Sequence, residues 1–262
     1  MEEQPQAPRA QLLDLGQPLI LTGPPRAVSG QFNVQNPTGE KLRIREATLR
    51  SSRSVGLTRK AGRLASSMFE DGLTLQRVVL RAGQSREVPV SLALDASTPP
   101  GTYHLELLVH DQLREVVMHV TEDVSLRIEP GQLVLPNRAG EKFTKRVVFT
   151  NDGNVPVNIR SLGTIVLDDE LASCRALRGA LSDVGDTMTT LDEFAAALGK
   201  RFKQLYEMLV LKVQNTAVTL EPGETRALDL KITLPDVLDA RARYNGFAAI
   251  STSSLAFTIV PD

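Results

Sequence analysis

The chain has 262 residues, of which 42% are hydrophobic and 23% charged, and its formal net charge is −1. This balance argues against binding of nucleic acid or membranes through a global charge, and no apolar run approaches the roughly 20 residues that cross a bilayer. The single cysteine, Cys174, excludes an internal disulfide and a cysteine-based zinc cluster, and we expect it to be a small core residue.

Residues 1–11 are rich in Gln, Pro and Glu, a composition that predicts a disordered leader. This segment is acidic where a secretory signal peptide would be basic, and no apolar stretch follows it. We therefore expect a cytoplasmic protein, or one that is peripheral on a larger complex.

From residue 12 onward, short runs of alternating apolar and polar residues are separated by turn sequences. Two such runs, 28–34 and 42–49, flank the turn Asn36-Pro37-Thr38-Gly39. Proline presets φ in such a turn, and glycine accepts positive φ. The pattern predicts antiparallel strands joined by tight turns.

A closing hairpin is predicted from residues 103–110 and 113–120, joined by the loop Asp111-Gln112. This register places His104 opposite His119 on the outward face. Two imidazoles at that spacing resemble a zinc site, but solvated histidines on a sheet face are the commoner explanation. We therefore expect no metal.

The second half of the chain repeats the first. Residues 143–167 follow the pattern of residues 28–50, and Val218–Leu230 matches Val78–Val90 almost position for position. An internal repeat of this kind indicates a duplicated fold, and strands at this spacing are typical of an antiparallel β-sandwich. The expected domains are 12–122 and 123–262.

The second copy carries an insertion, residues 168–209, that has the pattern of helices. Thr190 and Glu193 form a capping-box sequence, and apolar residues then recur at spacings of three and four. These signals predict a helix from Thr190 to about Met208. A weaker helix is expected over about 170–181, where Gly179 disfavours helical structure.

The apolar stripe of the second predicted helix has two interpretations. Such a stripe more often covers its own domain, yet both sheets of a sandwich already bury each other, which leaves the stripe available to a protein partner. The candidate partner-binding residues are Phe194, Leu198, Phe202, Leu205 and Leu209.

A cluster of basic residues lies in one strand of the first copy and in the loop that follows it. A basic end on a near-neutral protein is a candidate site for polyanions or an anionic ligand. A solvated loop explains the cluster better, and no aromatic residue interleaves the charges. The candidate residues are Lys41, Arg43, Arg45, Arg50, Arg53, Arg59, Lys60 and Arg63.

The turn and strand sequences at Phe149–Ile159, Leu220–Thr225 and Ala96–Tyr103 resemble bacterial immunoglobulin-like modules. The resemblance is to the group of CARDB, α-galactosidase-associated and Hydin/MSP-like domains. It implies a mainly β protein of two tandem immunoglobulin-like antiparallel β-sandwiches, and the residue pattern adds a helical insertion to the second. The second copy departs from the group's Pro-Gly-Xaa-Tyr motif, having Tyr244-Asn-Gly-Phe in its place.

No sequence feature points to catalysis. All three histidines fall in one predicted hairpin, without a nucleophile motif or a glycine-rich phosphate loop. We expect no enzyme activity, cofactor or small-molecule substrate. The predicted function is a non-catalytic structural or adaptor subunit that binds a protein partner in a larger assembly. A surface- or carbohydrate-binding spacer and a polyanion-binding module are the alternatives, although the absence of Trp disfavours carbohydrate binding.

Overall fold

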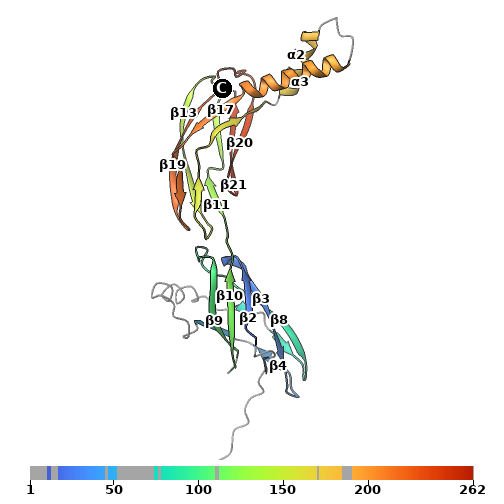
Figure 1. Ribbon diagram of the computed structural model, residues 1–262, viewed down its shortest axis with the longest axis vertical. Coiled ribbons are helices and arrows are strands. Elements are labelled where there is room, and N and C mark those ends of the chain that lie inside the picture. The colour runs from blue at the N-terminus through green and yellow to red at the C-terminus, as the bar shows by residue number, and fades with distance from the viewer. Residues whose placement is uncertain are drawn as a thin grey trace, which may run out of the picture. The chain divides into compact units, whose positions relative to one another are not determined.

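The computed structural model shows a mainly β protein made of two immunoglobulin-like sandwiches, the second with a helical insertion (Figure 1). The chain divides into two compact units, residues 1–123 with 153–155 and residues 124–152 with 156–262. The structure describes residues 11–12, 17–44, 47–51, 74–75, 78–109, 112–169, 171–184 and 191–261. That residues 12–122 and 123–262 fold independently stays a prediction.

The first unit is built around one continuous sheet in the order β5-β9-β10-β2-β3-β8-β6, with β1 beside β3 and a separate β4-β7 pair. Strand β2 pairs with β10 in parallel. A one-turn helix, η1 (Pro25–Ala27), follows β2. The strands are β1 (Gln11–Leu12), β2 (Leu19–Gly23), β3 (Val28–Gln35), β4 (Leu42–Ile44), β5 (Ala47–Ser51), β6 (Thr74–Leu75), β7 (Val78–Leu80), β8 (Ser85–Leu92), β9 (Gly101–Val109) and β10 (Gln112–Val120).

The second unit has two main sheets, β11-β13-β19-β17-β15 and β12-β21-β20-β16, and a β14-β18 pair. As in the first unit, an early strand, β12, runs parallel to the last one, β21. The strands are β11 (Leu126–Glu129), β12 (Gln132–Pro136), β13 (Lys142–Asn151), β14 (Val157–Ile159), β15 (Gly163–Val166), β16 (Asp168–Asp169), β17 (Val210–Gln214), β18 (Val218–Leu220), β19 (Thr225–Thr233), β20 (Tyr244–Ile250) and β21 (Ser253–Val260).

Along the strands, every second residue faces inward, and these residues form a separate core in each unit, as sandwich packing requires. In the first, Phe32, Leu107 and Met118 are fully buried. In the second, Phe149 and Phe257 are fully buried at the centre. Each apolar run of the sequence therefore buries one face in the core of its own unit.

A buried asparagine in each unit forms equivalent hydrogen bonds to the same kind of turn. The Asn36 side-chain amide donates to the Leu80 carbonyl at 3.3 Å, and the Asn151 amide donates to the Leu220 carbonyl at 3.0 Å. The backbone N–H and C=O of each asparagine bond to matching turn residues, Gln84 and Gly83 in one unit, Glu224 and Gly223 in the other. Both glycines have positive φ, +68° and +76°, which glycine adopts without steric cost. The shared geometry supports the interpretation of a duplicated fold.

We expect Asn151→Ala to destabilise the second unit by about 1–3 kcal/mol, because the buried Leu220 carbonyl loses its hydrogen-bond donor. Urea unfolding followed by circular dichroism measures the loss. Asn158→Ala, at an exposed position of β14, is the control and should change stability by less than about 0.5 kcal/mol. Equal small effects at the two positions would contradict a structural role for Asn151.

The closing hairpin of the first unit has a different register from the predicted one. Val109 pairs with Gln112, so His104 lies opposite Val117 and not opposite His119. The loop begins one residue earlier than expected, which shifts the pairing by two residues. A shift of two keeps every side chain on its face, so hydrophobic alternation alone does not distinguish the two registers.

The closing hairpins of both units carry a tyrosine at the equivalent position. This holds although the second unit departs from the Pro-Gly-Xaa-Tyr motif in its sequence. Tyr103 and Tyr244 each lie six positions before the last residue of the first strand of their hairpin, Val109 in β9 or Ile250 in β20. The Tyr103 hydroxyl donates to the Pro99 carbonyl at 2.7 Å. The Tyr244 hydroxyl instead accepts the N–H of Asp239 at 2.8 Å. Each tyrosine anchors the loop that precedes its strand.

Candidate partner-binding site: the helical hairpin of the second unit

Two helices of the insertion, α2 (Ala172–Val184) and α3 (Leu191–Met208), pack against each other beyond one end of the second sandwich (Figure 1). Both predicted helices are confirmed. Thr190, the expected cap of the second, lies outside the described residues. The hairpin interrupts the sandwich between β16 and β17.

Small residues on α2 form the face that packs on α3. Ala176 and Ala180 are buried, and a β-carbon at Gly179 would lie 3.2 Å from Nε of Arg201. Arg201 crosses α2 at this glycine and donates from Nε to Asp183 at 2.7 Å. This hydrogen bond lowers the pKa of Asp183. Gly179, which disfavours a helix by propensity, is thus explained by the close approach of the second helix.

The opposite face of α2 exposes apolar side chains. Leu171, Cys174, Leu177 and Leu181 recur at spacings of three and four, and we call them the outer row. All four are exposed, Leu181 by 54%. Cys174 is therefore not the small core residue that we expected. The prediction failed because α2 carries apolar residues on both faces, and its core-like positions are the alanines that face α3.

The predicted apolar stripe of the second helix divides into two parts. Phe194, Leu198 and Phe202 are half-buried on one side of α3. Leu209 follows the end of the helix, is 4% exposed and belongs to the sandwich core. It is therefore not accessible to a partner, because the chain has already entered the β17 strand region. The side chain of Leu205 lies outside the described part of the chain.

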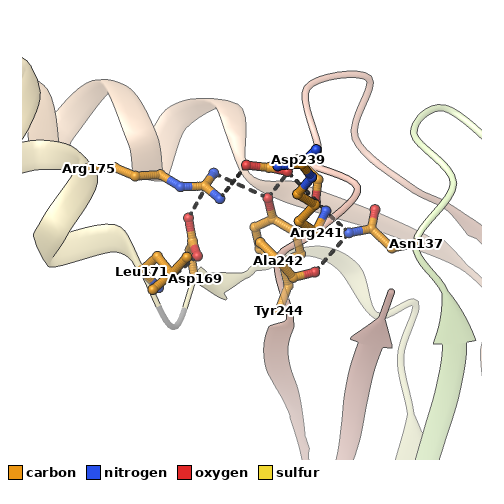
Figure 2. A network of polar contacts seen from close by, with 8 residues as sticks. All are labelled: Asn137, Asp169, Leu171, Arg175, Asp239, Arg241, Ala242 and Tyr244. Atoms are coloured by element: carbon orange, nitrogen blue, oxygen red, sulfur yellow. Dashed lines mark hydrogen bonds and ion pairs between the residues drawn. The ribbon is translucent and has the colours of Figure 1, made fainter. Parts of the chain in front are cut away.

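A polar network fixes the base of the hairpin to the sandwich (Figure 2). The Asp169 side chain is fully buried, and its Oδ1 accepts the N–H of Leu171 at 2.9 Å. Its Oδ2 lies 3.2 Å from Nη1 of Arg175, as an ion pair without hydrogen-bond alignment. Arg175 also donates to Asp239 at 2.9 Å and to the Tyr244 hydroxyl at 3.5 Å. One guanidinium thus joins β16, α2, β20 and the loop before β20.

The environment of Arg175 favours its charged form. Partial desolvation lowers the pKa of Arg175, but the Tyr244 hydroxyl and the carboxylates of Asp169 and Asp239 outweigh this effect and raise it. On the far side of Asp239, the Asn137 amide donates to the carbonyls of Asp239 and Ala242 at 2.7 and 2.8 Å (Figure 2). The loop that holds Arg175 is therefore itself held by the sandwich.

Sequence reasoning missed this network. The insertion with the helical pattern was expected to begin at residue 168, whereas the structure places Asp168 and Asp169 in β16, paired with Asn245 and Tyr244. Because the partner of Asp169 is Arg175 in the next element, only the fold brings the two charges together. The signal available was weak: an arginine six residues after the second of two aspartates.

Most of the predicted polyanion site lies outside the described residues. Lys41 is exposed. Arg43 and Arg50 lie in β4 and β5, and their side chains are outside what the structure describes. Outside the described residues altogether are Arg45, Arg53, Arg59, Lys60 and Arg63. Polyanion binding therefore stays a prediction.

Within the described ranges, no three His, Cys, Asp or Glu side chains are grouped so that they could hold a metal ion. Among the helices described, none has the length and apolar character needed to cross a membrane.

No family model and no curated protein matches the chain. Solved structures that are similar include the class 5 fimbriae chaperone CfaA, at 12% identity and a TM-score of 0.26, covering 97% of this chain and 100% of that one. The Pseudomonas aeruginosa CupB2 chaperone has 8% identity and a TM-score of 0.27, with 95% and 99% coverage. A PapD-like domain of human CEP192 has 14% identity and a TM-score of 0.26, with 52% and 82% coverage.

Similarities at this level carry no argument about function, and the sheet order and core given above are what define the fold. The sandwich fold that the sequence resemblance implies is present. Membership of the CARDB, α-galactosidase-associated and Hydin/MSP-like group stays a prediction.

Proposed function

We propose that the protein is a non-catalytic adaptor that binds a protein partner through the α2–α3 hairpin of its second unit. The observation that carries this proposal is the separation of the hairpin from the sandwich core. That core runs from Leu126 to Leu167 and resumes at Leu209, and no described residue of α2 or α3 belongs to it. The sandwich therefore buries its own apolar faces without the hairpin.

The outer row supplies the surface that such a role requires. Two amphipathic helices that pack on each other leave α2 with a second apolar face, the outer row, exposed to solvent. Apolar side chains gathered on one helix face are typical of sites where a partner docks. The half-buried Phe194, Leu198 and Phe202 hold the hairpin together in this proposal, and the outer row contacts the partner.

The polar network at the hairpin base suits a docking element. Arg175 and Asp169 fix the first turn of α2 to the sandwich, so less conformational freedom is lost when a partner binds. Preorganisation of this kind raises affinity by lowering the entropic cost of association.

We expect Leu177→Ser combined with Leu181→Ser to abolish partner binding while leaving the fold intact. Truncation of apolar anchors at an interface centre costs about 2 kcal/mol or more each, or roughly thirtyfold in affinity. Affinity purification of the tagged full chain identifies the partner, and titration of the purified partner measures the loss. Val134→Ser, at an exposed apolar position of β12, is the control and should bind as the native chain does. Unchanged binding by the double variant would contradict the proposal.

Among the described residues, no structural observation favours either alternative function over the adaptor role. A surface- or carbohydrate-binding spacer would use aromatic platforms, and the chain has no Trp and three Tyr. Two of those tyrosines, Tyr103 and Tyr244, use their hydroxyls to anchor loops.

A further inference from the structure

Strand β20 of the second unit has an outer edge that is mostly unpaired. On one side it pairs along its whole length with β21. On the other, β16 pairs with Tyr244 and Asn245 alone. The β15 strand approaches β20 near Gly246 but does not pair with it, so in the described part of the chain no strand is hydrogen-bonded to the edge from Gly246 to Ile250. This opening lies on the sandwich itself and is independent of the docking face on the hairpin.

The hairpin register identifies which backbone groups are free. Ile250 and Ser253 flank a two-residue loop, and such a flanking pair exchanges both backbone hydrogen bonds. Because the direction of the backbone groups alternates along a strand, Ala248 also bonds to β21, whereas Phe247 and Ala249 point their N–H and C=O groups to the open edge. These are the groups that an added strand would use.

The equivalent edge in the first unit is covered. There, β5 pairs antiparallel with β9 from Ala47 opposite Val109 to Ser51 opposite Leu105. In the second unit, β15 begins twelve residues after the buried turn asparagine Asn151. In the first unit, β5 begins eleven residues after the equivalent Asn36. However, β15 pairs with β17 in the other sheet, so among the described residues no strand pairs with the Gly246–Ile250 edge of β20 as β5 pairs with β9.

A cavity of about 450 Å³ lies next to this open edge. Its apolar lining includes Leu162, Ile165 and Ala248, and its polar lining includes Arg160. Inward-facing residues on β20 are small: Gly246 and Ala248 occupy the positions that Leu105 and Leu107 hold on β9, and Ala248 lines the cavity. The space at Gly246 is filled by Leu167, Ile165 and the Val166 carbonyl, 3.0–3.2 Å from where a β-carbon would lie. The space beside Ala248 stays open.

We propose that this edge binds an extended segment of a partner protein, which adds as a strand antiparallel to β20. The segment takes the place that β5 holds in the first unit, and its backbone bonds to Phe247 and Ala249. Every second side chain of the segment faces the cavity, so a large aliphatic residue opposite Ala248 fills it. A carboxylate on the segment pairs with Arg160, and its outward side chains lie beside Phe247, which is 73% exposed.

The test uses Ala249→Pro, which removes one outward N–H and no bond to β21. Proline is tolerated in this way at strand edges. A library of random dodecapeptides displayed on phage is selected on the immobilised full chain, and enriched peptides are synthesised and titrated. We expect sequences in which apolar residues alternate and an acidic residue recurs. Their affinity should fall at least tenfold on Ala249→Pro, and binding should raise the hydrogen-exchange protection of the Phe247 and Ala249 amides.

A second pair of variants keeps the test valid if Ala249→Pro does not fold. Phe247→Lys places a charge at the open edge, and Val134→Lys places one at an exposed position of β12, at the opposite edge of the same sheet. The first should weaken peptide binding at least tenfold and the second less than twofold. The proposal is overturned if no peptide is enriched, or if the enriched peptides bind Ala249→Pro and Phe247→Lys as tightly as they bind the native chain. It is also overturned if the chain forms a dimer that these two variants dissociate.

Discussion

Arg175→Ala is expected to destabilise the second unit by about 2–4 kcal/mol. The change removes the cation that compensates Asp169, whose side chain is fully buried. Breaking a buried ion pair from one side is strongly unfavourable because it leaves an isolated charge in a medium of low dielectric constant. The expected cost is lower than for a fully buried pair, since Arg175 is itself 29% exposed. Urea unfolding of the full chain measures it.

Two further variants separate the charge effect from the loss of a side chain. Arg178→Ala removes an exposed arginine from the same helix, and it should change stability by less than about 0.5 kcal/mol. Asp169→Asn in the Arg175→Ala background should recover part of the loss, because no buried charge then remains. If the double variant is as unstable as Arg175→Ala, the buried carboxylate is not the cause.

Leu209→Ala should destabilise the second unit by about 2–5 kcal/mol, the range for deletion of a buried leucine side chain. Leu209 continues the apolar spacing of α3, but it packs in the sandwich core. Leu181→Ala, on the outer row, should cost less than about 1 kcal/mol because that side chain is 54% exposed. Thermal and urea unfolding of the two variants compare a core position with a docking position of the same residue type.

The two leucines should also differ in binding. Leu181→Ala is expected to weaken the partner complex without affecting the fold, whereas Leu209→Ala affects the fold first. A large loss of stability for Leu181→Ala would show that α2 is covered by its own chain, and the outer row would then not be a docking face.

Local patterns in the sequence were sufficient for the mainly β fold and for both helices. Alternation and turn residues depend on neighbours a few positions apart, and the Asn36 and Asn151 turns show the same sequence logic in three dimensions. The register of the β9–β10 hairpin was not determined in this way, because a shift of two residues leaves the pattern of faces unchanged.

Features that depend on distant partners were not accessible from the sequence. Whether β15 pairs in one sheet or the other is decided by packing across the sandwich, and the open edge of β20 follows from that choice. Likewise, Cys174 and Ala176 lie two residues apart on α2, yet only the position of α3 determines that the alanine is buried and the cysteine exposed.

The exposure of Cys174 gives the chain a built-in point of attachment. It is the only cysteine of the 262 residues, and it lies between Leu171 and Leu177 in the outer row. A thiol-reactive fluorophore or crosslinker therefore modifies one defined position without any engineered substitution. A reporter at that position lies within the proposed docking face and on the sandwich-anchored turn of α2, where it senses an approaching partner directly.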